Sequence, residues 1–112
     1  MSPERLIYHI ADIQFWQNGK KAGAYRPPTF AQEGFIHCST ENQFIRVANF
    51  LFKGRSDLVL LEIDTSEVEA EIIYEGEAEE KFPHIYGPLN LDAVLRVLTF
   101  KPSPDGTFQS PL

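Results

Sequence analysis

Short runs of apolar residues, separated by polar caps and glycines, predict that strands and helices alternate in the first half of the chain. The run at residues 6–11 is rich in β-branched and aromatic residues, which indicates a strand. Asp12 then offers the side chain of a helix N-cap. Ile13 and Trp16 start the apolar face of a helix that we expect to end at Gly23.

A strand followed by a helix is predicted again in the next part of the chain. Residues 35–38 form a short apolar run opened by a glycine, which predicts a second strand. Ser39 or Thr40 should cap the helix that follows, because Thr40 and Gln43 match the spacing of a capping box. The apolar positions of this helix recur at helical spacing, at Phe44, Val47, Ala48 and Leu51, and Gly54 should end it.

The rest of the chain is mostly strand in pattern. The nearly continuous apolar run at 58–64 predicts a central strand. The other expected elements are a strand at 71–75, an ordered loop at 84–87 between Pro83 and Pro88, a helical turn at 91–94, a last strand at 94–100 and a loose tail at 102–112. This pattern predicts an α+β fold with two main helices beside a largely antiparallel sheet.

Composition supports one folded domain, residues 1–112. The chain has 43% hydrophobic and 23% charged residues, which is typical of a folded protein. Ten basic against sixteen acidic residues give a net charge of −6, and the basic residues are scattered, so we expect no nucleic-acid partner. No run approaches the about 20 apolar residues of a membrane helix, so we expect no membrane association.

The single cysteine, Cys38, excludes an intramolecular disulfide and fits a reducing compartment. The N-terminal segment lacks the pattern of a signal peptide. We therefore expect a cytoplasmic protein. The sequence leaves its oligomeric state open.

His37 stands at the end of a predicted strand, directly before the predicted helix cap. Ser39 and Thr40 would offer hydroxyls there, beside the free N–H groups of the first helical turn, which suits a phosphate or a carboxylate. The alternative is an ordinary helix cap next to a half-buried histidine. Strand alternation places Phe35 and His37 on one face and Cys38 on the other, so Cys38 should be a small buried thiol rather than a nucleophile paired with His37.

The loop between the two prolines holds His84 and Tyr86, two side chains capable of hydrogen bonding at a site. Its alternative interpretation is a well-packed turn in which the Tyr86 ring covers the core. His9, in the first strand, is either a site residue or a core histidine with satisfied hydrogen bonds. The separations between the three histidines match no local ligand spacing, so we expect no metal site. Glu62 and Glu75, both on predicted strands, are the candidate catalytic carboxylates.

Three segments together carry a family resemblance. They are residues 7–10, 34–39 and 82–89, with the sequences IYHI, GFIHCS and FPHIYGPL. In order and spacing they resemble the bacterial domain of unknown function 952 family, from about residue 6 to residue 108. The resemblance implies an ADP-ribosyltransferase-like fold with a small, split, mostly antiparallel β core. The cleft of that fold binds NAD or an ADP-ribosyl group.

The motif around His37 is also similar to the His-Leu-Ser strand end of the RNA 2′-phosphotransferases. This similarity implies that His37 and Ser39 touch ribose or phosphate and that His9 lies on the first strand of the cleft. The enzymatic hypothesis is then a small ADP-ribosyl- or NAD-linked transferase that acts on a nucleotide or a phosphorylated small molecule. In it His9, His37 and His84 line the cleft, Ser39 and Thr40 bind phosphate, and Tyr86 stacks on an aromatic ring. The alternative is a ligand-binding or protein-interaction domain of the same fold without turnover.

Overall fold

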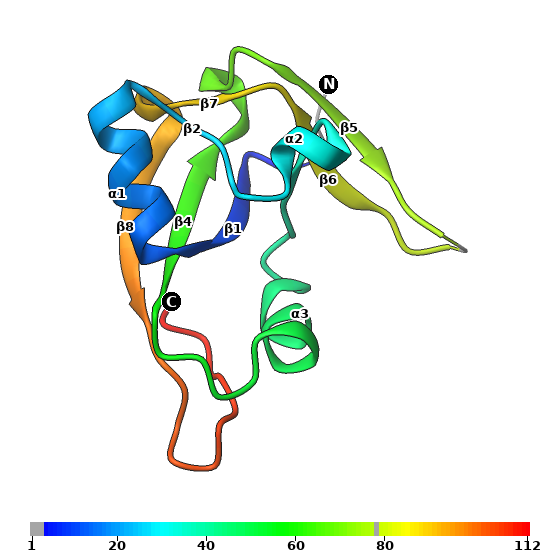
Figure 1. Cartoon of the computed structure of the whole chain (residues 1–112). Coiled ribbons are helices and arrows are strands. Elements are labelled where there is room, and N and C mark those ends of the chain that lie inside the picture. Colours follow the sequence, from blue (N-terminus) through cyan, green and yellow to red (C-terminus); the bar gives the residue numbers. More distant parts are fainter. Residues whose placement is uncertain (1–3, 78) are drawn as a thin grey trace.

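The computed structural model describes residues 4–77 and 79–112 and has an α+β architecture with antiparallel strand pairing throughout those ranges (Figure 1). One sheet has the order β1-β4-β8, built from β1 (Leu6–Asp12), β4 (Leu58–Asp64) and β8 (Val94–Phe100). A second has the order β3-β6-β5, built from β3 (Ile36–His37), β6 (Phe82–Tyr86) and β5 (Glu71–Glu75). A short pair joins β2 (Ala24–Tyr25) to β7 (Leu89–Asn90).

The described helices are α1 (Ile13–Ala22), α2 (Phe30–Glu33), α3 (Phe44–Leu51) and two 3₁₀ turns, η1 (Thr65–Glu67) and η2 (Leu91–Ala93). The ends of α1 are as predicted. The Asp12 carboxylate accepts hydrogen bonds from the backbone N–H groups of Gln14 and Phe15. At the other end Gly23 adopts a left-handed conformation with φ of 90°, which only glycine adopts without strain.

The central position predicted for the strand at 58–64 is confirmed, because β4 pairs with β1 on one side and β8 on the other. The side chains on the two faces of β4 belong to separate apolar clusters. Leu61 and Ile63 belong to a cluster that joins this sheet to Ile36 of β3 and Ile85 of β6. The cluster on the opposite face consists of Tyr8, Phe44, Ala48, Leu58, Leu60, Phe100 and Phe108. The first cluster therefore holds the two sheets together.

Residues 82–86 form a strand, so the predicted loop between Pro83 and Pro88 is wrong. β6 is the middle strand of its sheet, yet it contains Pro83. The carbonyl of Pro83 accepts a hydrogen bond from the N–H of Cys38, at the point where the β3 ladder ends. The N–H and C=O groups of one residue point to the same neighbouring strand. The N–H that Pro83 lacks would therefore point to β3, beyond the end of that short strand, and the hydrogen bonds between β6 and β5 are not interrupted. Figure 1 shows β5 and β6 as a hairpin that extends away from the other sheet.

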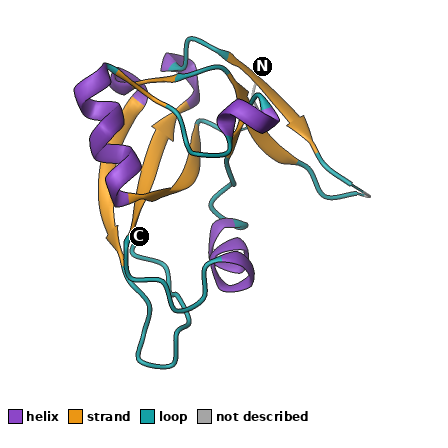
Figure 2. Cartoon of the chain, viewed as in Figure 1, coloured by secondary structure: helices purple, strands orange, loops and turns teal. Residues whose placement is uncertain are grey.

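Residues 101–112 hold no helix or strand, and Figure 2 shows them as a loop that runs near α3. The sequence predicted a loose tail here. Phe108 is only 3% exposed and stacks on Phe100 with 4.7 Å between ring centroids. The Phe108 N–H donates to the side-chain oxygen of Asn49 at 2.7 Å. This part of the tail therefore packs on the core.

Candidate functional site

The outer face of the β3-β6-β5 sheet collects four side chains with rings. His37 of β3 lies directly opposite His84 of β6 in the antiparallel register, so both side chains point to the same side of the sheet. Phe35 precedes His37 by two residues and Tyr86 follows His84 by two, which places them on that side as well. We call Phe35, His37, His84 and Tyr86 the ring face.

The four rings are in mutual contact. Phe35 stacks on His84 with 4.3 Å between ring centroids and 13° between ring planes. The His37 ring meets the rings of Phe35 and His84 edge-on, each with 4.8 Å between centroids. Tyr86 is tilted against Phe35 at 5.2 Å. Such stacked and edge-on arrangements are the favoured geometries of ring pairs, so the ring face is an organised surface.

The carboxylate of Glu75, on the neighbouring strand β5, anchors two of these rings. Its Oε1 accepts a hydrogen bond from His84 Nδ1–H at 2.9 Å and another from the Tyr86 hydroxyl. These bonds, that of Tyr86 first, lower the pKa of Glu75, while the same carboxylate raises the pKa of Tyr86. A carboxylate oxygen can only accept, so Nδ1 of His84 carries a proton in this contact.

A second carboxylate holds His37. The Nε2 atom of His37 lies 3.2 Å from Oε1 of Glu33, the last residue of α2. Gly34 adopts φ of 80° between them and turns the chain from α2 into β3. The His37 side chain is 56% exposed, while that of His84 is only 11% exposed. A ligand on this face would therefore reach His37 first.

His9 lies on the other side of β3, inside the protein. Its Nδ1–H donates to the carbonyl of His37 at 2.6 Å, and its Nε2 accepts from the Tyr25 hydroxyl at 2.8 Å. Burial lowers the pKa of His9 to about 4, so the ring is neutral near pH 7. Of the three predicted site histidines, the structure brings His37 and His84 together and places His9 behind the backbone of His37.

The predicted helix start at Ser39 or Thr40 is wrong, because α3 begins at Phe44 after a separate turn. Ser39 is buried and exchanges two backbone hydrogen bonds with Tyr8, of 2.8 and 2.7 Å. The Thr40 N–H donates to the side-chain oxygen of Gln43, which is one half of the predicted capping box. The Gln43 amide also donates to the carbonyl of residue 81, in the connection between β5 and β6. The N–H groups of Ser39 and Thr40 therefore already have partners.

The two candidate carboxylates have different surroundings. Glu75 belongs to the site. Glu62 faces the opposite cluster, where it accepts two hydrogen bonds from Arg96 and one from the Tyr8 hydroxyl. Glu33 was not predicted, because its approach to His37 depends on the turn at Gly34. The contact of Phe35 with three other rings was missed for a similar reason, although strand alternation placed it beside His37.

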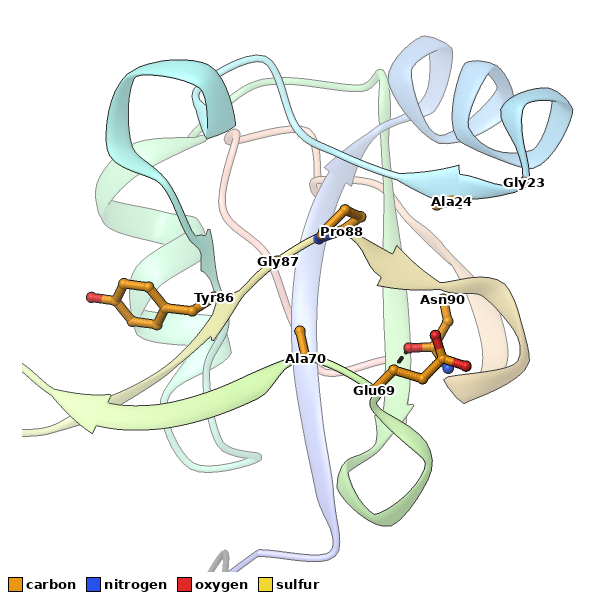
Figure 3. Close-up of a pocket in the computed structure, with 8 residues that line it drawn as sticks. All are labelled: Gly23, Ala24, Glu69, Ala70, Tyr86, Gly87, Pro88 and Asn90. Carbon is orange, nitrogen blue, oxygen red and sulfur yellow. Dashed lines mark hydrogen bonds between the residues drawn. The ribbon is translucent and has the colours of Figure 1, made fainter.

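A shallow pocket of about 480 Å³ adjoins this region and is lined in part by the end of β6 (Figure 3). Tyr86 borders the pocket, but its ring points away from the other residues that line it (Figure 3). Gly87 packs against Ala70 so closely that an added Cβ would lie 2.8 Å from the Ala70 Cβ. The Asn90 side-chain oxygen accepts from the Glu69 N–H at 3.0 Å. The pocket walls are therefore tightly packed next to the ring face.

Within residues 4–77 and 79–112, no group of three or more histidine, cysteine, aspartate or glutamate side chains is arranged to hold a metal ion. None of the helices in the same ranges has both the length and the apolar character needed to cross a bilayer. Cys38 is buried, as the alternation predicted, and burial raises the pKa of its thiol.

Residues 10–97 match the family model described as "Protein of unknown function (DUF952)". The chain belongs to the DUF952 family. The crystal structure of protein CC0527 from Caulobacter crescentus is similar to this DUF952 chain, with a TM-score of 0.85, 30% identity and 93% of each chain covered. The solution NMR structure of CC0527 is also similar, with a TM-score of 0.77, 29% identity, and 95% of this chain and 93% of that one covered. No curated protein matches the chain.

Proposed function

We propose that this DUF952 chain binds a nucleotide of the NAD or ADP-ribosyl class at the ring face. The observation that carries the proposal is the contact of Phe35, His37, His84 and Tyr86, together with the hydrogen bonds from His84 and Tyr86 to Glu75 of the neighbouring strand. Aromatic rings bind planar heterocycles by stacking, and His37 and Tyr86 are exposed enough to do so. The ADP-ribosyltransferase-like fold that the sequence motifs imply belongs to this proposal.

The hydrogen-bonding pattern also supports chemistry on the bound ligand. With its Nδ1–H held by Glu75, His84 can use Nε2 as a general base. An NAD-linked transferase or hydrolase would break the bond between the ribose and the nicotinamide ring. The ring would leave with the bonding electron pair, and His84 would take the proton of the attacking hydroxyl or water.

A second candidate function is binding without turnover. It is favoured by the position of His9, which is buried and used for structure, so that two rather than three histidines face the ligand. The enzymatic hypothesis assigned Ser39 and Thr40 to phosphate, but the backbone N–H groups of both residues already have partners within the protein. Release of nicotinamide from NAD distinguishes the two functions.

The first experiment is an NMR titration of ¹⁵N-labelled protein with NAD⁺ and, separately, with ADP-ribose. We expect saturable shifts centred on residues 35–37 and 84–86. The variant Tyr86→Ala should weaken binding about two- to tenfold, because it removes one stacking ring. Phe50→Ala is the matched control, since Phe50 is 84% exposed and lies on α3.

Unchanged spectra at millimolar concentrations of both ligands would refute the proposal. Shifts centred on α3, or equal weakening by Phe50→Ala, would place the ligand elsewhere. If the ligands bind, nicotinamide release measured by chromatography decides between the transferase or hydrolase and the binding protein. His84→Ala should abolish that release.

A further inference from the structure

We infer that the part of the ligand held at the ring face carries a permanent positive charge, as an N-alkylpyridinium or a quaternary ammonium group does. This inference rests on the proposed function, because it concerns the same site. It adds the chemical class of the group that the rings bind.

The rings themselves favour a cation. The faces of phenyl and phenol rings carry negative electrostatic potential and attract organic cations. The ring centroids of Phe35 and Tyr86 lie 5.2 Å apart, and Tyr86 is 38% exposed. Among the described residues, the cation–ring contacts are Lys20 over Trp16 and Arg55 over Phe52, so neither involves the ring face.

Acidic side chains surround these rings. Glu33 contacts His37, and Glu75 contacts His84 and Tyr86. A third acidic residue, Glu71, lies opposite Tyr86 in the register of β5 and β6. The negative charges therefore stand on two sides of the ring face, from α2 and from β5.

Basic side chains do not balance these charges in the described contacts. The partners of the Glu33 and Glu75 carboxylates there are histidine and tyrosine side chains. The charge of Lys81 contributes to lowering the pKa of Glu75, but the Lys81 ammonium group lies 3.5 Å from the carbonyl oxygen of Gly76, to which it donates. A phosphate would meet two or three carboxylates here, so a positively charged ring fits the site better than a phosphate does.

The test compares ligands that differ in charge but hardly in shape. 1-Methylnicotinamide, which is methylated on the ring nitrogen, carries a permanent positive charge, and nicotinamide is neutral. The second pair is NAD⁺, whose nicotinamide ring is positively charged, and NADH, whose nicotinamide ring is neutral. Dissociation constants are obtained from the ¹⁵N shifts at residues 35–37 and 84–86. We expect the charged member of each pair to have a dissociation constant at least fivefold lower than that of the neutral member. Tetramethylammonium forms a separate arm, which tells a quaternary ammonium ligand from a pyridinium.

The outcomes separate the inference from the proposed function. Equal binding of the charged and neutral members would overturn the inference and leave nucleotide binding intact. Binding of 1-methylnicotinamide or tetramethylammonium without binding of NAD⁺ would support the inference and refute the nucleotide proposal. If no probe binds at the ring face, both are refuted.

Single-charge variants place the effect at the site. Glu33→Gln and Glu75→Gln should each weaken binding of the charged probes about two- to fivefold more than binding of the neutral probes. Glu33 lies on the short helix α2, so its variant tests the charge even if Glu75→Gln disturbs the sheet. Glu41→Gln is the control, because it removes one exposed acidic charge from a turn outside the ring face. An equal loss with Glu41→Gln would mean that overall charge attracts the cation, and would overturn the inference.

Discussion

His9 is a neutral histidine held between two hydrogen-bonding partners. The His37 carbonyl accepts from its Nδ1–H, so the tautomer is determined and the Tyr25 hydroxyl must donate to Nε2. Protonation of the ring would reverse the Tyr25 bond, with Nε2–H donating to the hydroxyl oxygen, and would place a charge in the core. This is why the sequence alternatives for His9 resolve to a core histidine with satisfied hydrogen bonds.

This environment predicts a dependence of stability on pH. The unfolded chain binds a proton at His9 near its ordinary pKa of about 6.5, whereas the folded protein does so only near about 4. The unfolded state therefore binds more protons between these values, and the free energy of unfolding falls as the pH drops from 6.5 to 4. At about 1.4 kcal/mol for each unit, the loss is roughly 3 kcal/mol.

Urea denaturation of the wild type and His9→Gln across this pH range measures the effect. Glutamine does not titrate, so the variant should lose less stability than the wild type, while acidic groups affect both proteins alike. Parallel pH profiles would contradict the prediction. If the variant does not fold, NMR titration of the His9 ring in the wild type gives its pKa directly.

At the scale of an element, α1 depends on a glycine inside the helix. Gly19 faces Tyr25, and an added Cβ would lie 2.9 Å from the Tyr25 Cα. Replacing glycine by alanine in a helix ordinarily stabilises it by about 1 kcal/mol. Here the close approach to the β2 backbone outweighs that gain.

We therefore predict that Gly19→Ala lowers the free energy of unfolding by about 1–3 kcal/mol. Urea denaturation measures it. Gln17→Ala, at an exposed position of the same helix, is the control and should change stability by less than about 0.5 kcal/mol. A stabilised Gly19→Ala variant would show that α1 can move away from Tyr25.

At the scale of the whole molecule, the C-terminal segment covers the cluster on the outer side of the β1-β4-β8 sheet. Phe108 stacks on Phe100 and is bound through its backbone to Asn49 of α3. The segment thereby connects the last strand to a helix far from it in sequence.

Phe108→Ala should therefore cost about 3–4 kcal/mol of stability, as expected for loss of a buried aromatic ring. Urea denaturation with circular dichroism measures it. Leu112→Ala, near the chain end at a 46% exposed position, is the control. A change below about 0.5 kcal/mol for Phe108→Ala would mean that residues 102–112 are loose in solution, as the sequence predicted.

Local sequence determined much of the framework. The continuous apolar run at 58–64 requires burial on both faces, so it predicted the central strand. Asp12 and Gly23 marked the ends of α1 because capping and a left-handed turn are properties of single residues. Alternation placed Phe35 and His37 together, opposite Cys38, because successive side chains of a strand alternate between its faces.

Contacts between segments distant in the sequence determined the elements that the sequence predicted wrongly. Pro83 indicated a loop, but its missing N–H falls at the end of the short strand β3, so the chain can continue as β6. Helix α3 begins at Phe44, and the residue before it, Gln43, donates its side-chain amide to the carbonyl of residue 81, far away in the sequence.

The candidate site divides in the same way. His37, His84, Tyr86 and Glu75 were recognisable from the sequence as polar or ring-bearing residues. Their contact depends on the register that sets His37 opposite His84, and on β5 bringing Glu75 beside them. Register is a property of the assembled sheet, set by burial of its apolar face, so only the tertiary structure could place these residues together.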